Sequence, residues 1–320
     1  MNQVLDEISK IGIVPVVKLD RVEDASPLAK ALCDGGLPCA EVTFRTSCAA
    51  QAIKIMTTNY PNMLVGAGTV LTIEQAEQAI QAGAKFIVSP GLSPKVVTYC
   101  IKNNIPVTPG CANPSDIEQA IELGLDVVKF FPAEAAGGLS MIKAMSAPYV
   151  NMKFMPTGGI HAKNLIDYLD FKKVIACGGS WMVKDDFIKS GDFKKITELT
   201  KEAVSVLLGF SLRHIGINTE NDTHAHQICD VFCKMFGFSS TGGSKSFFAG
   251  NGLEIMKGKG PGTMGHIAIQ TNSVDRAVYH LSMQGIEFDM DTATYAATGY
   301  MKFIYLKGEF ARFGVHLIEK

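Results

Sequence analysis

A single lysine interrupts an otherwise apolar stretch, VVKFFPAE at residues 127–134. Moving an isolated ammonium group out of water is costly, so the side chain of Lys129 must meet a partner, reach solvent or lose its proton. A lysine that has lost its proton is a nucleophile that forms imines with carbonyl compounds. An internal salt bridge to a carboxylate is the alternative explanation, and for an isolated lysine it would be the commoner one.

A second stretch, CAEVTFR at residues 39–45, supplies a carboxylate and a guanidinium. Successive side chains of a strand point to opposite faces, so Glu41 and Arg45 share one face and the apolar residues between them share the other. The apolar face must meet the outer helices. We therefore expect Glu41 and Arg45 to face the same interior as Lys129.

Two glycine-rich segments add a possible anion site. They are PTGGI at residues 156–160 and CGGSW at residues 177–181. Glycine lets backbone N–H groups approach a phosphate closely, and barrel loops after the seventh and eighth strands commonly bind one. An interior lysine, glutamate and arginine beside such loops would suit an anionic, phosphorylated carbonyl compound.

The elements that must position these residues alternate between short β-branched runs and amphipathic helices. No G-x-G-x-x-G follows the first run, which counts against a dinucleotide-binding sheet. Eight units over about two hundred residues predict an α/β fold of the (β/α)8 TIM-barrel type. The eight runs begin at Ile13, Cys39, Leu64, Phe86, Pro106, Val127, Met152 and Val174.

The chain's composition restricts its partners and location. Its 30 Lys and Arg residues are balanced by 31 Asp and Glu residues. A net charge of -1 argues against a nucleic acid or an anionic membrane as partner. The N-terminal MNQVLDEISK lacks the pattern of a secretory signal, and no apolar run reaches the length of a membrane span, so we expect a cytoplasmic protein.

With EVTFRT, GAGTVL, SPG, KFFPAE, PTGGI and GGSW in this order, the sequence resembles the 2-keto-3-deoxy-6-phosphogluconate (KDPG) and 4-hydroxy-2-oxoglutarate (KHG) aldolase family. The resemblance covers residues 1–209, the first expected domain. It implies a class I aldolase, a carbon–carbon lyase that cleaves KDPG to pyruvate and glyceraldehyde 3-phosphate. It further implies a homotrimer that needs no metal or other cofactor.

The resemblance also implies a role for each residue of the motifs. Lys129 would form the Schiff base and Glu41 would be the acid/base. The residues expected to bind substrate are Arg45 and Thr69 at the carboxylate, Pro90 and Phe131 at the pocket wall, and Gly158, Gly159, Gly179 and Ser180 at the phosphate.

Three points of function stay open at this stage. A side activity on KHG is expected because KHG shares the 2-oxo-4-hydroxy acid core of KDPG. The galactonate epimer of KDPG could be the main substrate. Alternatively, the barrel could be an inactive sugar-phosphate binding or sensory protein.

Residues 210–320 form a second expected domain with an internal repeat. RHIGINT at residues 213–219 recurs as GHIAIQT at residues 265–271, and each is followed by a helix-like run and short strands. This pattern predicts a smaller α+β domain of two β-α-β-β-β units, which resembles the vicinal oxygen chelate (glyoxalase-like) superfamily.

In metal-using members of that superfamily, each unit gives one ligand from its first strand and one from its last. The matching positions are His214, Glu254, His266 and His316. A divalent ion such as zinc, nickel, manganese or iron would suit them. The alternative is a binding or purely structural module that holds no metal.

Overall fold

The computed structural model describes residues 2–320 and divides into two compact units, Met1–Leu207 and Leu208–Lys320. Each unit is described by itself. Within residues 2–320, no helix combines the length and the apolar character that crossing a membrane requires.

The first unit contains all eight strands expected from the sequence. Parallel pairing joins six of them in the order β5-β4-β3-β2-β1-β8, and β6 pairs with β7. Isolated parallel bridges join Gly110 to Lys129, next to β5 and β6, and Thr157 to Gly178, next to β7 and β8. The strands are β1 (Ile13–Val17), β2 (Cys39–Thr43), β3 (Leu64–Gly68), β4 (Ile87–Ser89), β5 (Val107–Pro109), β6 (Val127–Phe130), β7 (Lys153–Pro156) and β8 (Cys177–Gly179).

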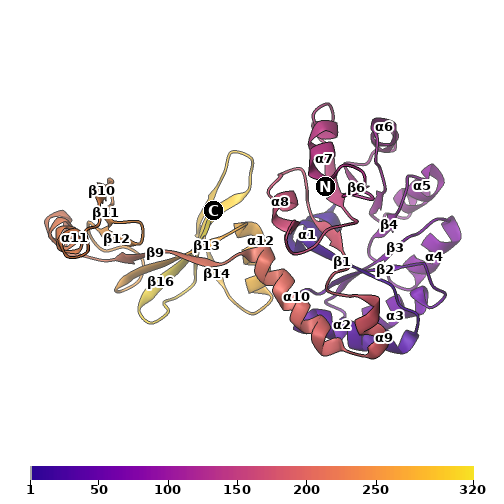
Figure 1. Ribbon diagram of the computed structural model, residues 1–320, viewed down its shortest axis with the longest axis horizontal. Coiled ribbons are helices and arrows are strands. Elements are labelled where there is room, and N and C mark those ends of the chain that lie inside the picture. The colour runs from indigo at the N-terminus through magenta and orange to yellow at the C-terminus, as the bar shows by residue number, and fades with distance from the viewer. Residues whose placement is uncertain (1) are drawn as a thin grey trace. The chain divides into compact units, whose positions relative to one another are not determined.

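Helices surround this curled sheet, as Figure 1 shows for α2 to α6. Local sequence explains where several begin. The Thr72 hydroxyl accepts a hydrogen bond from the Gln75 N–H and caps α4, and Asn113 caps α6 ahead of Pro114. The helices are α1 (Gln3–Ile11), α2 (Ala25–Asp34), α3 (Ala49–Asn59), α4 (Ile73–Gln81), α5 (Pro94–Lys102), α6 (Pro114–Glu122), α7 (Gly138–Ser146), α8 (Leu165–Leu169), α9 (Asp185–Ser190) and α10 (Phe193–Leu208), with a short 3₁₀ turn at Val22–Asp24.

The core of the first unit lies on both faces of its strands. Val42 on β2 and Phe130 on β6 are fully buried, as the apolar parity of both stretches predicts. The expected fold is confirmed as an α/β barrel-like unit followed by a separate, sheet-rich region.

The second unit is built on one eight-stranded sheet in the order β10-β11-β12-β9-β13-β16-β15-β14. The element order of its first half recurs in its second half, and β9 and β13 pair antiparallel at the centre. The first half consists of β9 (Ser211–Ile217), α11 (Asp222–Phe236), β10 (Ser240–Gly242), β11 (Ser246–Ala249) and β12 (Leu253–Met256), and the second of β13 (Gly265–Thr271), α12 (Val274–Ser282), β14 (Phe288–Tyr295), β15 (Met301–Leu306) and β16 (Phe313–Glu319).

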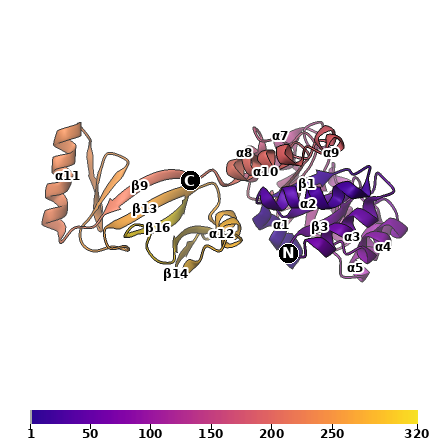
Figure 2. The same ribbon diagram turned by 90° about the horizontal axis from the view of Figure 1, so that it is seen from below.

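One core cluster of this unit joins α11 to its sheet. Ala225 and Cys229 on α11 pack with Ala249 on β11 and Ile255 on β12, and all four are buried. Figure 1 shows α11 beside β10, β11 and β12, and Figure 2 shows α11 at one end of this unit. Burying the apolar side of α11 in this way leaves the other face of the sheet available to polar side chains.

Candidate active site and candidate metal site

Lys129 and Glu41 meet inside the first unit. The Lys129 Nζ atom lies 3.4 Å from the Glu41 Oε1 atom, and both side chains are buried. The same Nζ atom lies 5.2 Å from the centre of the Phe131 ring. The shared interior predicted from strand parity is therefore observed for Lys129 and Glu41. An ammonium, a carboxylate and an aromatic ring this close form a site where proton transfer and imine chemistry are both feasible.

The two oxygen atoms of Glu41 have different surroundings. Oε1 receives the hydrogen bond from Lys129, whereas Oε2 is buried and no group within residues 2–320 donates to it. A buried carboxylate oxygen without a donor favours a ligand whose hydroxyl group donates to it. Gly68 on the neighbouring strand makes room for this side chain, because a Cβ atom there would lie 2.2 Å from Glu41 Oε1.

Arg45 lies beyond the end of the strand on which strand parity predicts its direction. Strand β2 ends at Thr43, so Arg45 falls in the turn that follows and its side chain is exposed. Alternation of side chains holds only while the backbone is extended, which explains the difference. Arg45 Nε donates to the Thr43 hydroxyl at 3.2 Å, and that hydroxyl donates to the Val17 carbonyl at 2.9 Å.

The other predicted residues of the first unit lie at the carboxyl ends of its strands. Since parallel strands end at the same edge, this edge gathers residues that are distant in sequence. Thr69 directly follows β3 with a φ of 55°, a rare conformation for a β-branched residue. The remaining positions are Pro90 after β4, Phe131 after β6, Gly158 and Gly159 after β7, Gly179 at the end of β8, and Ser180 after it.

The backbone at PTGGI requires its glycines. Gly158 and Gly159 have φ values of 102° and 82°, which other residues rarely adopt. A Cβ atom on Gly159 would lie 2.5 Å from Cγ of Glu134, whose carboxylate accepts a hydrogen bond from the Tyr168 hydroxyl. Glu134 therefore packs closely against the glycines of this loop.

Thr157 is a polar residue of this edge that the sequence analysis did not select. Its hydroxyl is buried, and no partner for it exists within the described chain. A Cβ atom on Gly178 would lie 2.3 Å from that hydroxyl. The available signal was a polar side chain directly after the buried strand β7.

In the second unit, the register of the sheet brings the four predicted ligands to one face. Gly216 on β9 pairs with both Glu254 on β12 and His266 on β13. Ala268 on β13 pairs with both His214 on β9 and His316 on β16. His214 and Gly216 are two residues apart, so both rows of side chains point to the same side of the sheet.

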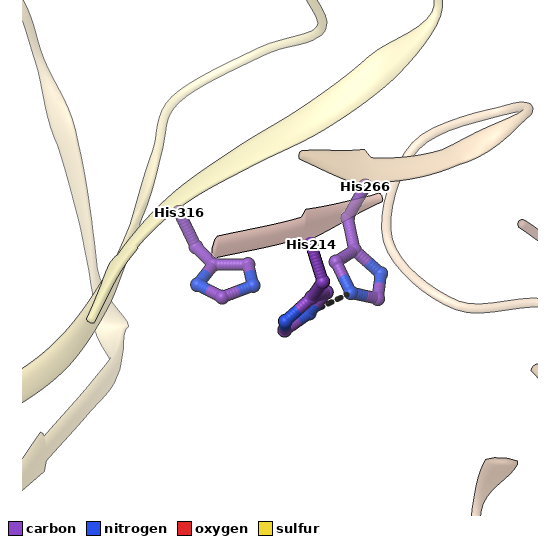
Figure 3. A group of neighbouring side chains, drawn as sticks. All are labelled: His214, His266 and His316. Atoms are coloured by element: carbon purple, nitrogen blue, oxygen red, sulfur yellow. Dashed lines mark hydrogen bonds between the residues drawn. The ribbon is translucent and has the colours of Figure 1, made fainter. Parts of the chain in front are cut away.

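The small residues in these rows leave space for the rings. A Cβ atom on Gly216 would lie 2.1 Å from Cε1 of His266. Sequence analysis missed Gly216 and Ala268, although each lies two positions after a histidine of the repeat. Figure 3 shows the three imidazoles of His214, His266 and His316 converging from three strands.

Three ligand atoms in this cluster are separated by equal distances. His214 Nε2, His266 Nε2 and Glu254 Oε2 lie 3.0 Å from one another in each pair. His316 completes the group, since the three histidines offer ligand atoms within 4.8 Å of one another. With bonds of about 2.1 Å to one ion, such separations correspond to ligand angles of roughly 90°. The donor set and its spacing fit a divalent ion.

Hydrogen bonds keep the carboxylate of this cluster ionised. Burial raises the pKa of Glu254, but hydrogen bonds from His214, His266 and Ser246 outweigh burial and hold the pKa below its ordinary value. Burial, followed by electrostatic interaction with His266 and His214, lowers the pKa of His316 to about 3. Metal ligation requires an ionised carboxylate and neutral imidazoles, and these shifts favour those states for Glu254 and His316.

Comparison with known proteins shows which family the first unit resembles. The family model for KDPG and KHG aldolase matches residues 4–199. A 2-dehydro-3-deoxy-phosphogluconate aldolase of Treponema pallidum is 49% identical over 207 residues, which are 65% of this chain and 99% of the relative. The KHG/KDPG aldolase of Escherichia coli K12 is 43% identical over 192 residues, 60% of this chain and 90% of the relative.

A solved structure agrees with these sequence matches. The KDPG aldolase of Legionella pneumophila, with pyruvate captured as a covalent carbinolamine intermediate, has a TM-score of 0.61 and 40% identity. The similarity covers 63% of this chain and 98% of that chain. The family model ends at residue 199, so the second unit lies outside it.

Proposed function

The chain belongs to the KDPG and KHG aldolase family, and from this premise we propose that it cleaves KDPG to pyruvate and glyceraldehyde 3-phosphate. The single observation that carries the proposal is the buried contact between Lys129 and Glu41, 3.4 Å apart, within the residues that the family model matches. The enzyme is a class I aldolase, a carbon–carbon lyase whose intermediate is a Schiff base.

Lys129 begins the reaction. Neutral Nζ attacks the C2 carbonyl of the substrate, and loss of water leaves a protonated imine. Breaking the C3–C4 bond puts an electron pair on C3, and the iminium group accepts it far better than a ketone would. The resulting enamine is protonated at C3, and water releases pyruvate and regenerates Lys129.

Glu41 moves the protons of this sequence. Its carboxylate takes the C4 hydroxyl proton as the aldehyde leaves, and it returns a proton to C3 of the enamine. The position of Oε2, buried and without a donor within residues 2–320, supports this role. The Lys129 contact holds the other oxygen, so the carboxylate meets the substrate in a fixed orientation.

The carboxyl edge of the barrel provides anchors for the two anionic ends of the substrate. Arg45 and Thr69 would hold the carboxylate, and Pro90 and Phe131 would form the pocket wall. The segments that hold Gly158, Gly159, Gly179 and Ser180 would bind the phosphate through backbone N–H groups. The positive φ values of Gly158 and Gly159 support a backbone that approaches its ligand closely.

The finer architecture is part of the same proposal. Residues 1–209 form a complete (β/α)8 barrel that assembles as a homotrimer, and residues 210–320 form a vicinal oxygen chelate domain of two β-α-β-β-β units. The isolated bridges at Gly110 and Thr157 and the repeated element order of the second unit support these assignments.

Comparing substrates tests the proposed activity. We expect kcat/KM for pyruvate release to be highest with KDPG and lower with unphosphorylated KHG. The ratio of kcat/KM for KDPG to kcat/KM for its galactonate epimer shows how strongly the site selects the configuration at C4. A preference for KHG would contradict the assignment of PTGGI and CGGSW as phosphate-binding segments, and ligand binding without pyruvate release would identify a sensory protein instead.

We further propose that His214, Glu254, His266 and His316 hold one divalent ion in the second unit. Such an ion would supply Lewis acidity toward an oxygen ligand. The equal separations of 3.0 Å among three ligand atoms support the proposal. We expect about one ion per chain in protein purified without a histidine tag and loss of that ion in a His214→Ala, His266→Ala variant. Parent protein without metal, or a variant that retains it, would contradict the site.

A further inference from the structure

The cleft at the metal cluster has a rim of lysines. It has a volume of about 750 Å³, and its lining includes His214, Glu254, His266 and His316. The segment KGKGPG at residues 257–262 contributes five of its six residues to this lining, and Lys245 lies beside them. Neither the barrel chemistry nor the metal ligands account for these residues.

Hydrogen bonds fix the KGKGPG segment in place. The Asn218 Oδ1 atom accepts from the Gly260 N–H at 2.8 Å. The Asn218 amide nitrogen donates to the Gly260 carbonyl at 3.3 Å and to the Gly262 carbonyl at 2.8 Å. The segment is therefore held at the cleft by a half-buried side chain, and its lysines extend from a fixed backbone.

The lysines differ in how far their charge is already neutralised. Lys257 Nζ lies 3.1 Å from an Asp222 carboxylate oxygen and 4.2 Å from the centre of the Phe247 ring. Lys245 and Lys259 are exposed, and within residues 2–320 no carboxylate forms an ion pair with either. Two cations at the cleft thus remain available to a ligand.

The charges of the cleft sum to a positive total. Glu254 is the one carboxylate among the described residues that line it. A divalent ion exceeds the charge of Glu254 by one, and Lys245 and Lys259 add two more. Charges of one sign in a concave site concentrate ligands of the opposite sign.

We propose that the second unit binds a small oxyacid with at least two negative charges, one group coordinating the ion and another meeting Lys245 and Lys259. This inference rests on the proposed metal site. The second anionic group is a phosphate or a carboxylate, since a lysine ammonium pairs with either. The hydroxyl of Tyr305, also in the lining, offers a further donor.

Paramagnetic relaxation with the chain of 320 residues provides the test. Protein is stripped with a chelator and reloaded with Mn²⁺, and bound manganese is counted by elemental analysis. The relaxation of ligand protons is then measured for 3-phosphoglycerate, for malate and for glycerate. Enhancement falls steeply with distance from Mn²⁺, so the signal reports on ligands that are bound close to the ion. The His214→Ala, His266→Ala variant corrects for manganese that is free or bound elsewhere.

We expect 3-phosphoglycerate or malate to bind at least about tenfold more tightly than glycerate, which carries one charge. Preference for 3-phosphoglycerate identifies a phosphate ligand, and preference for malate identifies a dicarboxylate. In a Lys245→Ala, Lys259→Ala variant, this affinity should fall at least about tenfold while the manganese content stays unchanged. Lys234→Ala, on α11 and outside the cleft lining, is the matched control and should retain the parent affinity.

Other outcomes separate the two proposals. If manganese binds but glycerate binds as tightly as 3-phosphoglycerate and malate, the oxyacid proposal is wrong and the metal site stands. The same holds if the lysine variant retains the parent affinity. If the parent takes up no more manganese than the histidine variant, the metal site is wrong and the oxyacid proposal falls with it.

Discussion

At residue scale, the two oxygen atoms of the Glu41 carboxylate have different hydrogen-bond partners. Oε1 accepts from Lys129 at 3.4 Å, and Oε2 is buried and faces no donor within residues 2–320. The same pair could be an internal salt bridge alone. A carboxylate that only neutralised Lys129 would gain stability from donors to both oxygens, so the free oxygen favours a role in proton transfer.

Replacing Glu41 by glutamine separates these two explanations. Glu41→Gln keeps the size of the side chain but removes the proton acceptor, so we expect kcat for KDPG cleavage to fall by about 10²- to 10⁴-fold. Lys129 should still form an imine with pyruvate. Stopped-flow assays and a melting curve check both points. A folded variant with parent kcat would show that Glu41 is structural.

Gly68 is predicted to be required for activity because it leaves space for the Glu41 side chain. In Gly68→Ala, the new Cβ atom would lie 2.2 Å from Oε1 and 2.6 Å from Cγ of Glu41, so this buried side chain must move. We expect kcat to fall at least about tenfold, since small displacements of a catalytic group are costly. Gly91→Ala adds the same methyl group where no atom of the described chain lies within 4 Å, and it should leave kcat unchanged.

At the scale of elements, strand parity predicted part of the site in the first unit. It placed Lys129 and Glu41 in one interior because β6 and β2 are extended at those residues. It does not determine the direction of Arg45, which follows the end of β2, because alternation stops where the strand stops. Strand ends depend on tertiary packing, which the residue pattern alone does not determine.

The residues that shape the sites were harder to predict than those that do chemistry. Gly216 and Ala268 matter because register places each between two ligands, and register is a property of strand pairs. Thr157 was missed because its hydroxyl becomes significant only once Gly178 is known to lie beside it. The superfamily resemblance and the internal repeat indicated the candidate ligands but gave no distances between strands.

Gly216→Ala tests this role of register. The added Cβ atom would displace the buried His266 ring, with contacts of 2.1 Å to Cε1 and 2.5 Å to Nε2. We expect affinity for a divalent ion to fall on the order of tenfold or more, as measured by competition with a chelating dye. Gly252→Ala, where no described atom lies within 4 Å of the new Cβ, is the control. Equal affinity in both variants would show that Gly216 does not position His266.

At the scale of the whole molecule, we propose two separate chemistries for this chain. The first unit uses an imine as its electron sink and has its candidate residues at the carboxyl edge of its strands. The second unit presents a cluster suited to a metal ion on one sheet face. Each set of candidate residues lies within a single unit.

Removing metal should therefore leave aldolase activity intact. Treatment with a chelator is expected to strip the ion from the second unit while kcat and KM for KDPG stay within about twofold of their starting values. Pyruvate release and metal content are measured on the same sample. Loss of cleavage in step with loss of metal, restored by adding the ion back, would show that the two chemistries are linked.

The central claim is that Lys129 forms the imine, and chemical trapping tests it most directly. The chain of 320 residues is incubated with pyruvate and borohydride, digested and analysed by mass spectrometry. We predict one reduced pyruvyl group per chain, located on Lys129, and none in a Lys129→Arg variant, since arginine keeps the charge but forms no imine. A modification on another lysine, or an unmodified Lys129 in protein that still releases pyruvate from KDPG, would contradict the mechanism.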